Sequence, residues 1–131
     1  MLKRHAFFEG AIRPGREAAF DAYVKEKLVP MWTNFPRALK VEVLREVEAE
    51  EGSHRYPMVL AIAYPDLPAI DEALGSPVRA QSREATKGLF DYFEGRIFHV
   101  VYRVDDQAPA AVRPSNVNRP CVATTRPTDH R

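Results

Sequence analysis

Four histidines are the side chains of this sequence best suited to moving protons near neutral pH, and two of them differ from the others in their surroundings. His5 and His99 lie among branched and aromatic residues, whereas His54 and His130 lie in polar segments. Polar turns and chain ends usually face solvent, so we expect His54 and His130 at the surface. A histidine among apolar neighbours is either a neutral, hydrogen-bonded core residue or a proton carrier. The candidate catalytic residues are therefore His99 and His5.

Polar residues near His99 could hold an oxyanion or a phenolate. Arg96, Tyr102 and Arg103 share with it the segment RIFHVVYRV, which the sequence predicts to be a strand. Strict alternation places His99 and Arg103 on one face of that strand, and Arg96 and Tyr102 on the other. These residues cannot all line one pocket.

Aromatic side chains that carry a polar atom could shape a small-molecule pocket between helix and sheet. Such pockets are mostly apolar with a few placed polar groups, and a buried phenol or indole needs a hydrogen-bond partner. The candidate substrate-binding residues are Tyr23, Trp32, Tyr64 and Arg96. Plain core packing explains the three aromatic residues equally well, and the sequence leaves both interpretations open.

No motif for a metal, a phosphate or a dinucleotide occurs in the chain. G-x-G-x-x-G, P-loop and H-E-x-x-H patterns are absent, and the single cysteine, Cys121, has no zinc-type spacing around it. We therefore expect no metal and no cofactor.

The charge balance points to no polyanionic partner. Nineteen basic residues stand against 18 acidic ones, a formal net charge of +1, so no overall field exists to hold nucleic acid or an anionic membrane. The apolar start of the chain breaks after Phe8, too early for a signal peptide or a membrane span. We expect a soluble, cytoplasmic protein that binds neither nucleic acid nor membrane.

Composition divides the 131 residues into a domain, 1–104, and a tail, 105–131. The tail holds four of the eleven prolines and none of the aromatic residues. It has too little apolar area to offset the entropy of ordering it, so we expect it to be extended or disordered.

Periodicity predicts an alternating order of elements within the domain. Strands are expected over 2–11, 39–48, 56–64 and 96–104, and helices over 16–35, 67–74 and 77–93. Pro30 should kink or restart the first helix because it lacks an amide donor. Asp66 and Ser76 are the expected N-caps of the later helices.

This order predicts an α+β fold, the ferredoxin-like split βαβ sandwich: a four-stranded antiparallel sheet with helices on one face. The strands over 2–11 and 56–64 are apolar on both faces and should be central. Two helices cover only one face of such a sheet, and a large apolar face is rarely left in water. A second copy of the chain should cover the other face, so we expect a homodimer.

Two segments, FDAYVKE over 20–26 with Pro30-Met31 after it, and Leu74-Gly75-Ser76-Pro77, resemble the EthD-like proteins of the dimeric α/β-barrel superfamily. The resemblance covers roughly residues 3–104 and implies a dimeric barrel. It also implies activities such as cofactor-free oxygenation, isomerisation, dehydration or haem breakdown, although many EthD-like members have no assigned reaction. The family commonly carries a histidine two residues before the proline, and Leu28 takes that place here.

Three hypotheses follow. In the first, the chain is a small cofactor-free enzyme acting on an aromatic or polyketide-like molecule, with His99 or His5 as the base. In the second, it is a non-catalytic binding or accessory protein that holds a hydrophobic ligand in the same pocket, and Leu28 marks a lost catalytic site. In the third, it is a structural dimer whose tail engages a partner.

Overall fold

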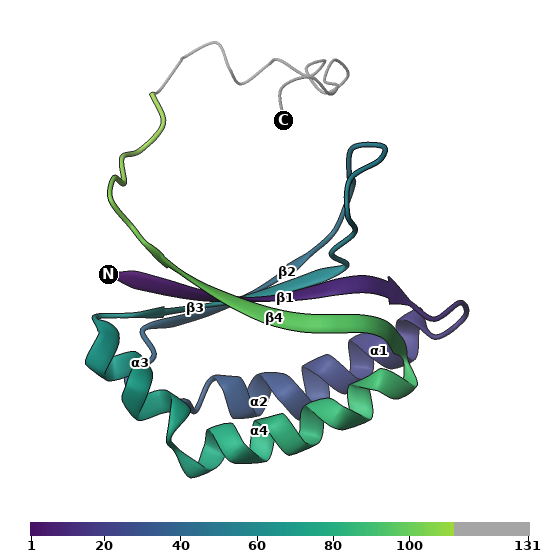
Figure 1. Ribbon diagram of the computed structural model, residues 1–131, viewed down its shortest axis with the longest axis horizontal. Helices are drawn as coiled ribbons and strands as arrows, with labels where there is room; N and C mark the ends of the chain where they lie inside the picture. Colours follow the sequence, from purple (N-terminus) through teal and green to yellow (C-terminus); the bar gives the residue numbers. More distant parts are fainter. Residues whose placement is uncertain (112–131) are drawn as a thin grey trace.

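A computed structural model describes residues 1–111 as a four-stranded antiparallel sheet with helices packed along one side (Figure 1). The strands are β1 (Leu2–Ile12), β2 (Lys40–Arg45), β3 (Met58–Tyr64) and β4 (Phe93–Arg103). The helical elements are α1 (Glu17–Tyr23), the π-helical turn η1 (Val24–Leu28), α2 (Val29–Trp32), α3 (Leu67–Leu74), α4 (Pro77–Lys87) and the 3-10 turn η2 (Gly88–Asp91). The strand order is β2-β3-β1-β4, which is the ferredoxin-like order expected from the sequence.

The two strands that are apolar on both faces occupy the middle of the sheet, as predicted. β1 pairs with β3 from Leu2↔Tyr64 to Phe8↔Met58. On its other side β1 pairs with β4 over its whole length, from Leu2↔Arg103 to Ile12↔Phe93. β1 is therefore hydrogen-bonded along both edges, and its side chains reach the two faces of the sheet alternately.

The first helix is interrupted where the proline predicts an interruption. Pro30 cannot donate the backbone hydrogen bond of a regular turn, and the chain widens into η1 just before α2 restarts at Val29. Phe20, Val24 and Leu28 still form one fully buried stripe against the sheet.

The later helices begin at the predicted caps. The Asp66 carboxylate accepts a hydrogen bond from the Ala69 amide at 2.9 Å, and the Ser76 hydroxyl accepts one from the Arg79 amide at 3.3 Å. The second of these helices is shorter than predicted, because α4 ends at Lys87 and η2 follows. β2 also ends early, at Arg45, and the connection to β3 extends beyond the sheet (Figure 1).

β4 starts three residues earlier than predicted because Gly95 lies inside the strand instead of ending a helix. It faces Gly10 across the β1–β4 ladder, and both glycines have positive φ, 151° and 144°. A Cβ on Gly95 would lie 2.0 Å from the carbonyl oxygen of Glu9. The two backbones come this close only because neither residue has a side chain.

Replacing Gly95 by alanine should therefore destabilise the fold strongly. We expect Gly95→Ala to lower the free energy of unfolding by about 2 kcal/mol or more, from backbone strain and the clash together. Urea denaturation followed by circular dichroism measures the change. The matched control is Gly75→Ala, because Gly75 has φ −92° and a Cβ there meets nothing closer than 3.6 Å. Equal destabilisation by the two variants would contradict the close-approach argument.

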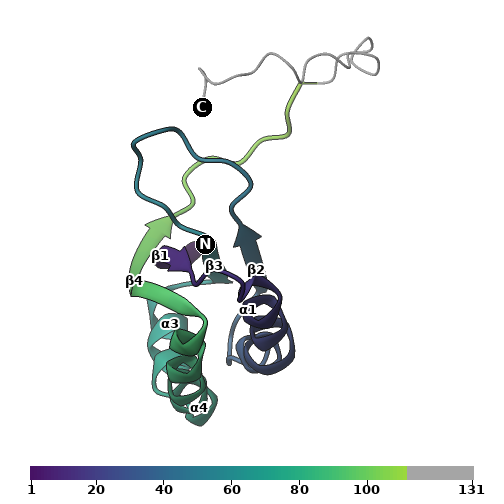
Figure 2. The ribbon, with the colours of Figure 1, turned by 90° about the vertical axis from the view of Figure 1, so that its right-hand side faces the viewer.

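The hydrophobic core lies between the sheet and the helices, which all pack on the same side (Figure 2). We call this side of the sheet the helix face and the opposite side the outer face. Within residues 1–111 no helix covers the outer face. The side chains on it include a cluster of rings whose centroids lie 5.1–5.8 Å apart, formed by His5, Phe7, Tyr56, Phe98 and Tyr102.

Residues 105–111 of the predicted tail follow β4 without helix or strand, and residues 112–131 lie outside the described part of the chain. Among residues 1–111 no helix has the length and apolar character needed to span a bilayer.

Candidate functional site

A cavity of about 740 Å³ opens between the helix face of the sheet and the helices α2 and α4. Small side chains leave the space, because Ala6 on β1 and Ala80 on α4 both line it. The larger apolar lining residues are Phe8, Trp32, Phe35, Leu60, Ile62, Phe90 and Ile97. This volume and this mostly apolar wall are typical of a site for a small organic molecule.

Three of the four arginines that line the cavity come from β1 and α4. Arg4 comes from the central strand β1, and Arg79 and Arg83 lie one turn apart on α4. No ion pair within residues 1–111 joins any of the three to a carboxylate. Burial and then the charge of Arg79 lower the pKa of Arg4, while burial and then Arg83 lower the pKa of Arg79. The cavity therefore carries an unneutralised positive charge.

His99 lines this cavity beside the arginines. It sits on β4 directly opposite Ala6 of β1 and projects from the helix face. Partial burial is the first cause that lowers its pKa, to about 4, and the charges of Arg4, Arg79 and Arg83 act in the same direction. The imidazole is neutral at pH 7 and can accept a proton.

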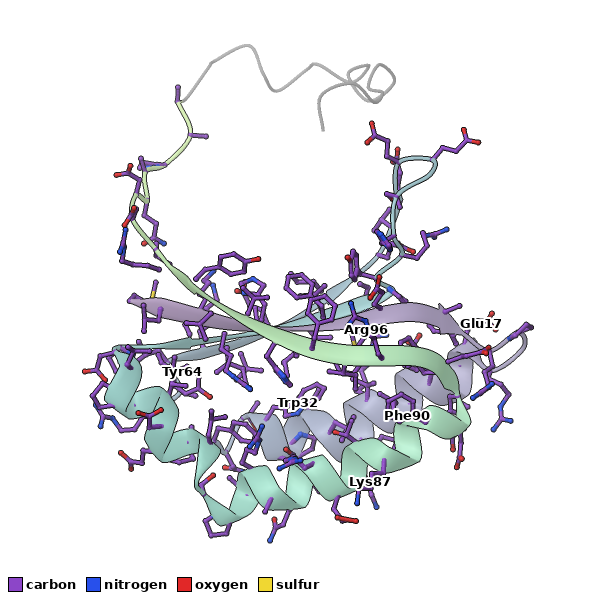
Figure 3. All side chains as sticks on the ribbon, in the orientation of Figure 1. Glu17, Trp32, Tyr64, Lys87, Phe90 and Arg96 are labelled. Atoms are coloured by element: carbon purple, nitrogen blue, oxygen red, sulfur yellow. The ribbon has the colours of Figure 1, made fainter. Side chains whose placement is uncertain are left out.

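The predicted aromatic residues Trp32 and Tyr64 differ in their relation to this cavity. Trp32 lines the cavity, and Tyr64 is buried beside it, where it interacts electrostatically with Arg4 and Arg79. Burial raises the pKa of the Tyr64 phenol, and the two arginines oppose the increase. Figure 3 labels Trp32, Phe90 and Lys87 around the space between sheet and helices, with Tyr64 toward one end.

Tyr23 lies outside the cavity. Its hydroxyl donates a hydrogen bond of 2.7 Å to the carbonyl oxygen of Ala85 on α4, and its ring packs edge-on against Tyr92. This contact between helices satisfies the phenol, so Tyr23 has the packing role that the sequence left open.

Arg96 contributes to the rim of the cavity, but its charge lies on the outer face. Its Nε donates to Glu9 Oε1 at 2.8 Å, and the guanidinium stacks over the ring of Phe98 at 4.7 Å. Because Glu9 and Phe98 hold the guanidinium, the charge of Arg96 is directed away from the cavity. Arg96 and His99 project from opposite faces of β4, as alternation predicts, although both contribute to the lining of the cavity.

His5 and His99 lie on adjacent strands but on opposite faces of the sheet. His5 pairs with Val100, and His99 pairs with Ala6. His5 stacks on Phe7 on the outer face, and its Nδ1 is buried with no hydrogen-bond partner in the described part of the chain. The two histidines therefore cannot act together in one cavity of a single chain.

Sequence reasoning missed the three arginines of the cavity. Signals did exist: Arg4 alternates with Ala6 and Phe8 on the strand, and Arg79 and Arg83 have the four-residue spacing of one helix face. It also missed the cluster on the outer face in which Glu9 contacts both Arg96 and His54. The His54 side chain is 77% exposed, as its polar turn predicts.

No group of three or more metal-ligating side chains occurs within residues 1–111. The cavity is lined by several cationic side chains, one imidazole and a single carboxylate, Glu84, which is paired with Lys87, and this excess of cations suits an anion.

Comparison with known proteins identifies the fold. No protein-family model matches the chain, and a search of curated proteins found no match. Among solved structures, an EthD family protein from Bacillus halodurans has a TM-score of 0.63 at 17% identity, covering 80% of this chain and 99% of that one. SnoaB, a cofactor-independent oxygenase from Streptomyces nogalater crystallised as the N63A mutant, has a TM-score of 0.59 at 16% identity, over 83% and 97%. An antibiotic biosynthesis monooxygenase has a TM-score of 0.52 at 19% identity, over 83% and 100%.

The chain thus has the ferredoxin-like α+β fold of the EthD and antibiotic biosynthesis monooxygenase structures. At these identities the likeness concerns the fold, while activity has to be argued from the site. The ferredoxin-like α+β fold predicted from the sequence is confirmed, and the dimer that the resemblance implied stays a prediction.

Proposed function

We propose that this chain is a small enzyme that binds an aromatic or polyketide-like molecule in the cavity and removes a proton from it with His99. The observation that carries the proposal is the position of the His99 imidazole beside three guanidinium groups that have no carboxylate partner within residues 1–111, above an apolar floor. The fold supports it, because one structural neighbour is a cofactor-independent oxygenase.

The chemistry follows from the charges in the cavity. The ring of the substrate would lie against Trp32 and its aromatic neighbours, and the Nε2 or Nδ1 lone pair of His99 would take a proton from a carbon or oxygen next to a carbonyl. The guanidinium groups would stabilise the negative charge that develops on the carbonyl oxygen. Isomerisation, dehydration and cofactor-free oxygenation all start with this step, so the residues present suit each of them.

Blocking the cavity tests whether it is the binding site. We expect Ala80→Trp to weaken binding of a neutral aromatic hydroxyketone, 2-acetyl-1-naphthol, by about 10-fold or more, because the indole fills space that the ligand needs. Isothermal titration calorimetry measures the dissociation constant. Gln81→Trp is the matched control, since Gln81 is exposed on the same helix and does not line the cavity. Equal affinity in all three proteins would place the ligand elsewhere and contradict the proposal.

A non-catalytic binding protein is the second candidate, and one observation favours it. Leu28, at the position where EthD-like proteins commonly carry histidine, is fully buried in the core and has no proton to transfer. In that case the same cavity would hold the ligand without turning it over. This alternative would be favoured if calorimetry shows that a ligand binds and prolonged incubation of the protein with that ligand gives no product.

We also propose that the chain forms a homodimer through the outer face. The ring cluster on that face has no cover within residues 1–111, and face-to-face packing of two sheets would bury it. His5 would then lie in the interface and not in the cavity.

A further inference from the structure

Resting on the proposed site, we infer that its ligand is an amphipathic organic anion, an aromatic carboxylate whose charged group is held between Arg4, Arg79 and Arg83. The proposed function requires only a proton to remove. The arrangement of charges in the cavity restricts the ligand further.

The cavity holds an excess of positive charge that the chain itself does not neutralise. Glu84 also lines it, but this carboxylate lies 3.0 Å from the Lys87 ammonium and is engaged there. Arg96 at the rim is held by Glu9 on the outer face. Arg4, Arg79 and Arg83 remain, so the site has a local charge near +3 in a protein whose formal net charge is only +1.

This clustering is unfavourable for the empty protein. Arg79 and Arg83 are like charges at i and i+4 on one helix face, a spacing that destabilises a helix. Arg4 lies half-buried on a central strand, where a cation loses part of its hydration. Arg4 lies on the same side of the sheet as Arg79 and Arg83 because side chains alternate along β1 and α4 packs on that side. A bound anion would offset both the repulsion between the helical arginines and the lost hydration of Arg4.

Arginine is a donor suited to a carboxylate in shape as well as in charge. A guanidinium group presents a planar fork of N–H donors that binds a carboxylate through two parallel hydrogen bonds. Here Arg4 lines the cavity from the sheet, and Arg79 and Arg83 line it from α4. The apolar floor, with Trp32 and Phe35, would take the rest of the molecule. A flat aromatic acid satisfies both parts, whereas an inorganic anion would leave the floor unoccupied.

The test compares 2-naphthoate with 2-naphthamide, a neutral ligand of nearly the same shape, by isothermal titration calorimetry on the full chain. We expect the carboxylate to bind at least about 10-fold more tightly at low salt, and its advantage to shrink as ionic strength rises. Arg79→Gln and Arg83→Gln should each weaken naphthoate binding by about 10- to 100-fold and change naphthamide binding little. Arg103→Gln is the control, because Arg103 is exposed, bonded to Asp105 and outside the cavity.

Several outcomes would overturn the inference. They are equal affinity of wild type for the two ligands, no binding of naphthoate at millimolar concentration, and a naphthoate affinity unchanged by both arginine substitutions. Thermal melts of each variant separate loss of binding from loss of fold, and Arg83 is exposed, so its substitution should fold. If naphthoate and naphthamide bind equally while Ala80→Trp blocks both, the anion inference fails and the proposed small-molecule site stands.

Discussion

Replacing His99 by glutamine is expected to lower kcat by about 10²- to 10⁴-fold on any substrate that the protein turns over, with a smaller change in KM. Glutamine keeps hydrogen-bonding capacity and approximate size but cannot accept a proton. Steady-state kinetics of the purified variant measure the effect. Such a loss confined to kcat identifies the imidazole as the base that acts on bound substrate.

Two further histidine variants make this experiment specific. His54→Gln changes an exposed residue of the β2–β3 connection and should leave kcat within about two-fold. His5→Gln tests the rival base, which lies on the outer face. If His5→Gln abolishes turnover and His99→Gln does not, the assignment of the base to the cavity is wrong. Unchanged turnover in both would remove histidine catalysis altogether.

The pH dependence of activity gives an independent readout. The base works when neutral, and the pKa of His99 in the free protein is lowered to about 4, so kcat/KM should rise through pH 4 and be level by pH 6. A bound anion would offset the charges of the arginines that lower this pKa. In the complex with an anionic substrate, kcat should therefore rise at a higher pH than kcat/KM does. A limb near pH 6.5 in kcat/KM would contradict the electrostatic account of the site.

The same shift affects stability in a defined pH window. The pKa of His99 is lower in the folded chain than the ordinary value of 6.5, so the unfolded chain binds more protons between about pH 6.5 and 4. The contribution of His99 to stability is fully present above pH 6.5 and decreases as the pH falls through that window.

Substituting Phe98 by glutamate is expected to produce the largest change in assembly. Phe98 lies on the outer face, stacked on Phe7 at 5.3 Å between ring centroids. If two sheets pack through this face, a carboxylate there is buried without a partner, and the dimer dissociation constant should rise about 100-fold or more. Sedimentation velocity at micromolar protein should show a dimer for the wild type and a monomer for Phe98→Glu.

The control for this experiment lies on the other side of the molecule. Leu67 is 59% exposed at the start of α3, so Leu67→Glu adds the same charge without touching the outer face. It should sediment as the wild type does. A wild-type chain that sediments as a folded monomer would contradict the homodimer.

Local patterns in the sequence determined most of the architecture. The four-residue spacing of Phe20, Val24 and Leu28 predicts the first helix, and Pro30 predicts its interruption. Alternation along the last strand is sufficient to separate His99 from Arg96, because successive side chains of a strand must point to opposite faces. These features depend on neighbouring residues, so one sequence is enough to predict them.

Tertiary structure decided which of these features form a site. Alternation shows that His99 and Arg96 lie on different faces, but only the packing of the helices shows that the cavity lies on the face of His99 and that Arg96, whose guanidinium bonds Glu9 on the outer face, reaches only its rim. Gly95 is a helix terminator by sequence and a strand residue in the fold, because its conformation is imposed by Gly10 on another strand. Arg4 and Arg83 line the same cavity only because the strands pair and α4 docks on the sheet. Contacts between distant segments depend on the relative placement of whole elements, and no local periodicity carries that information.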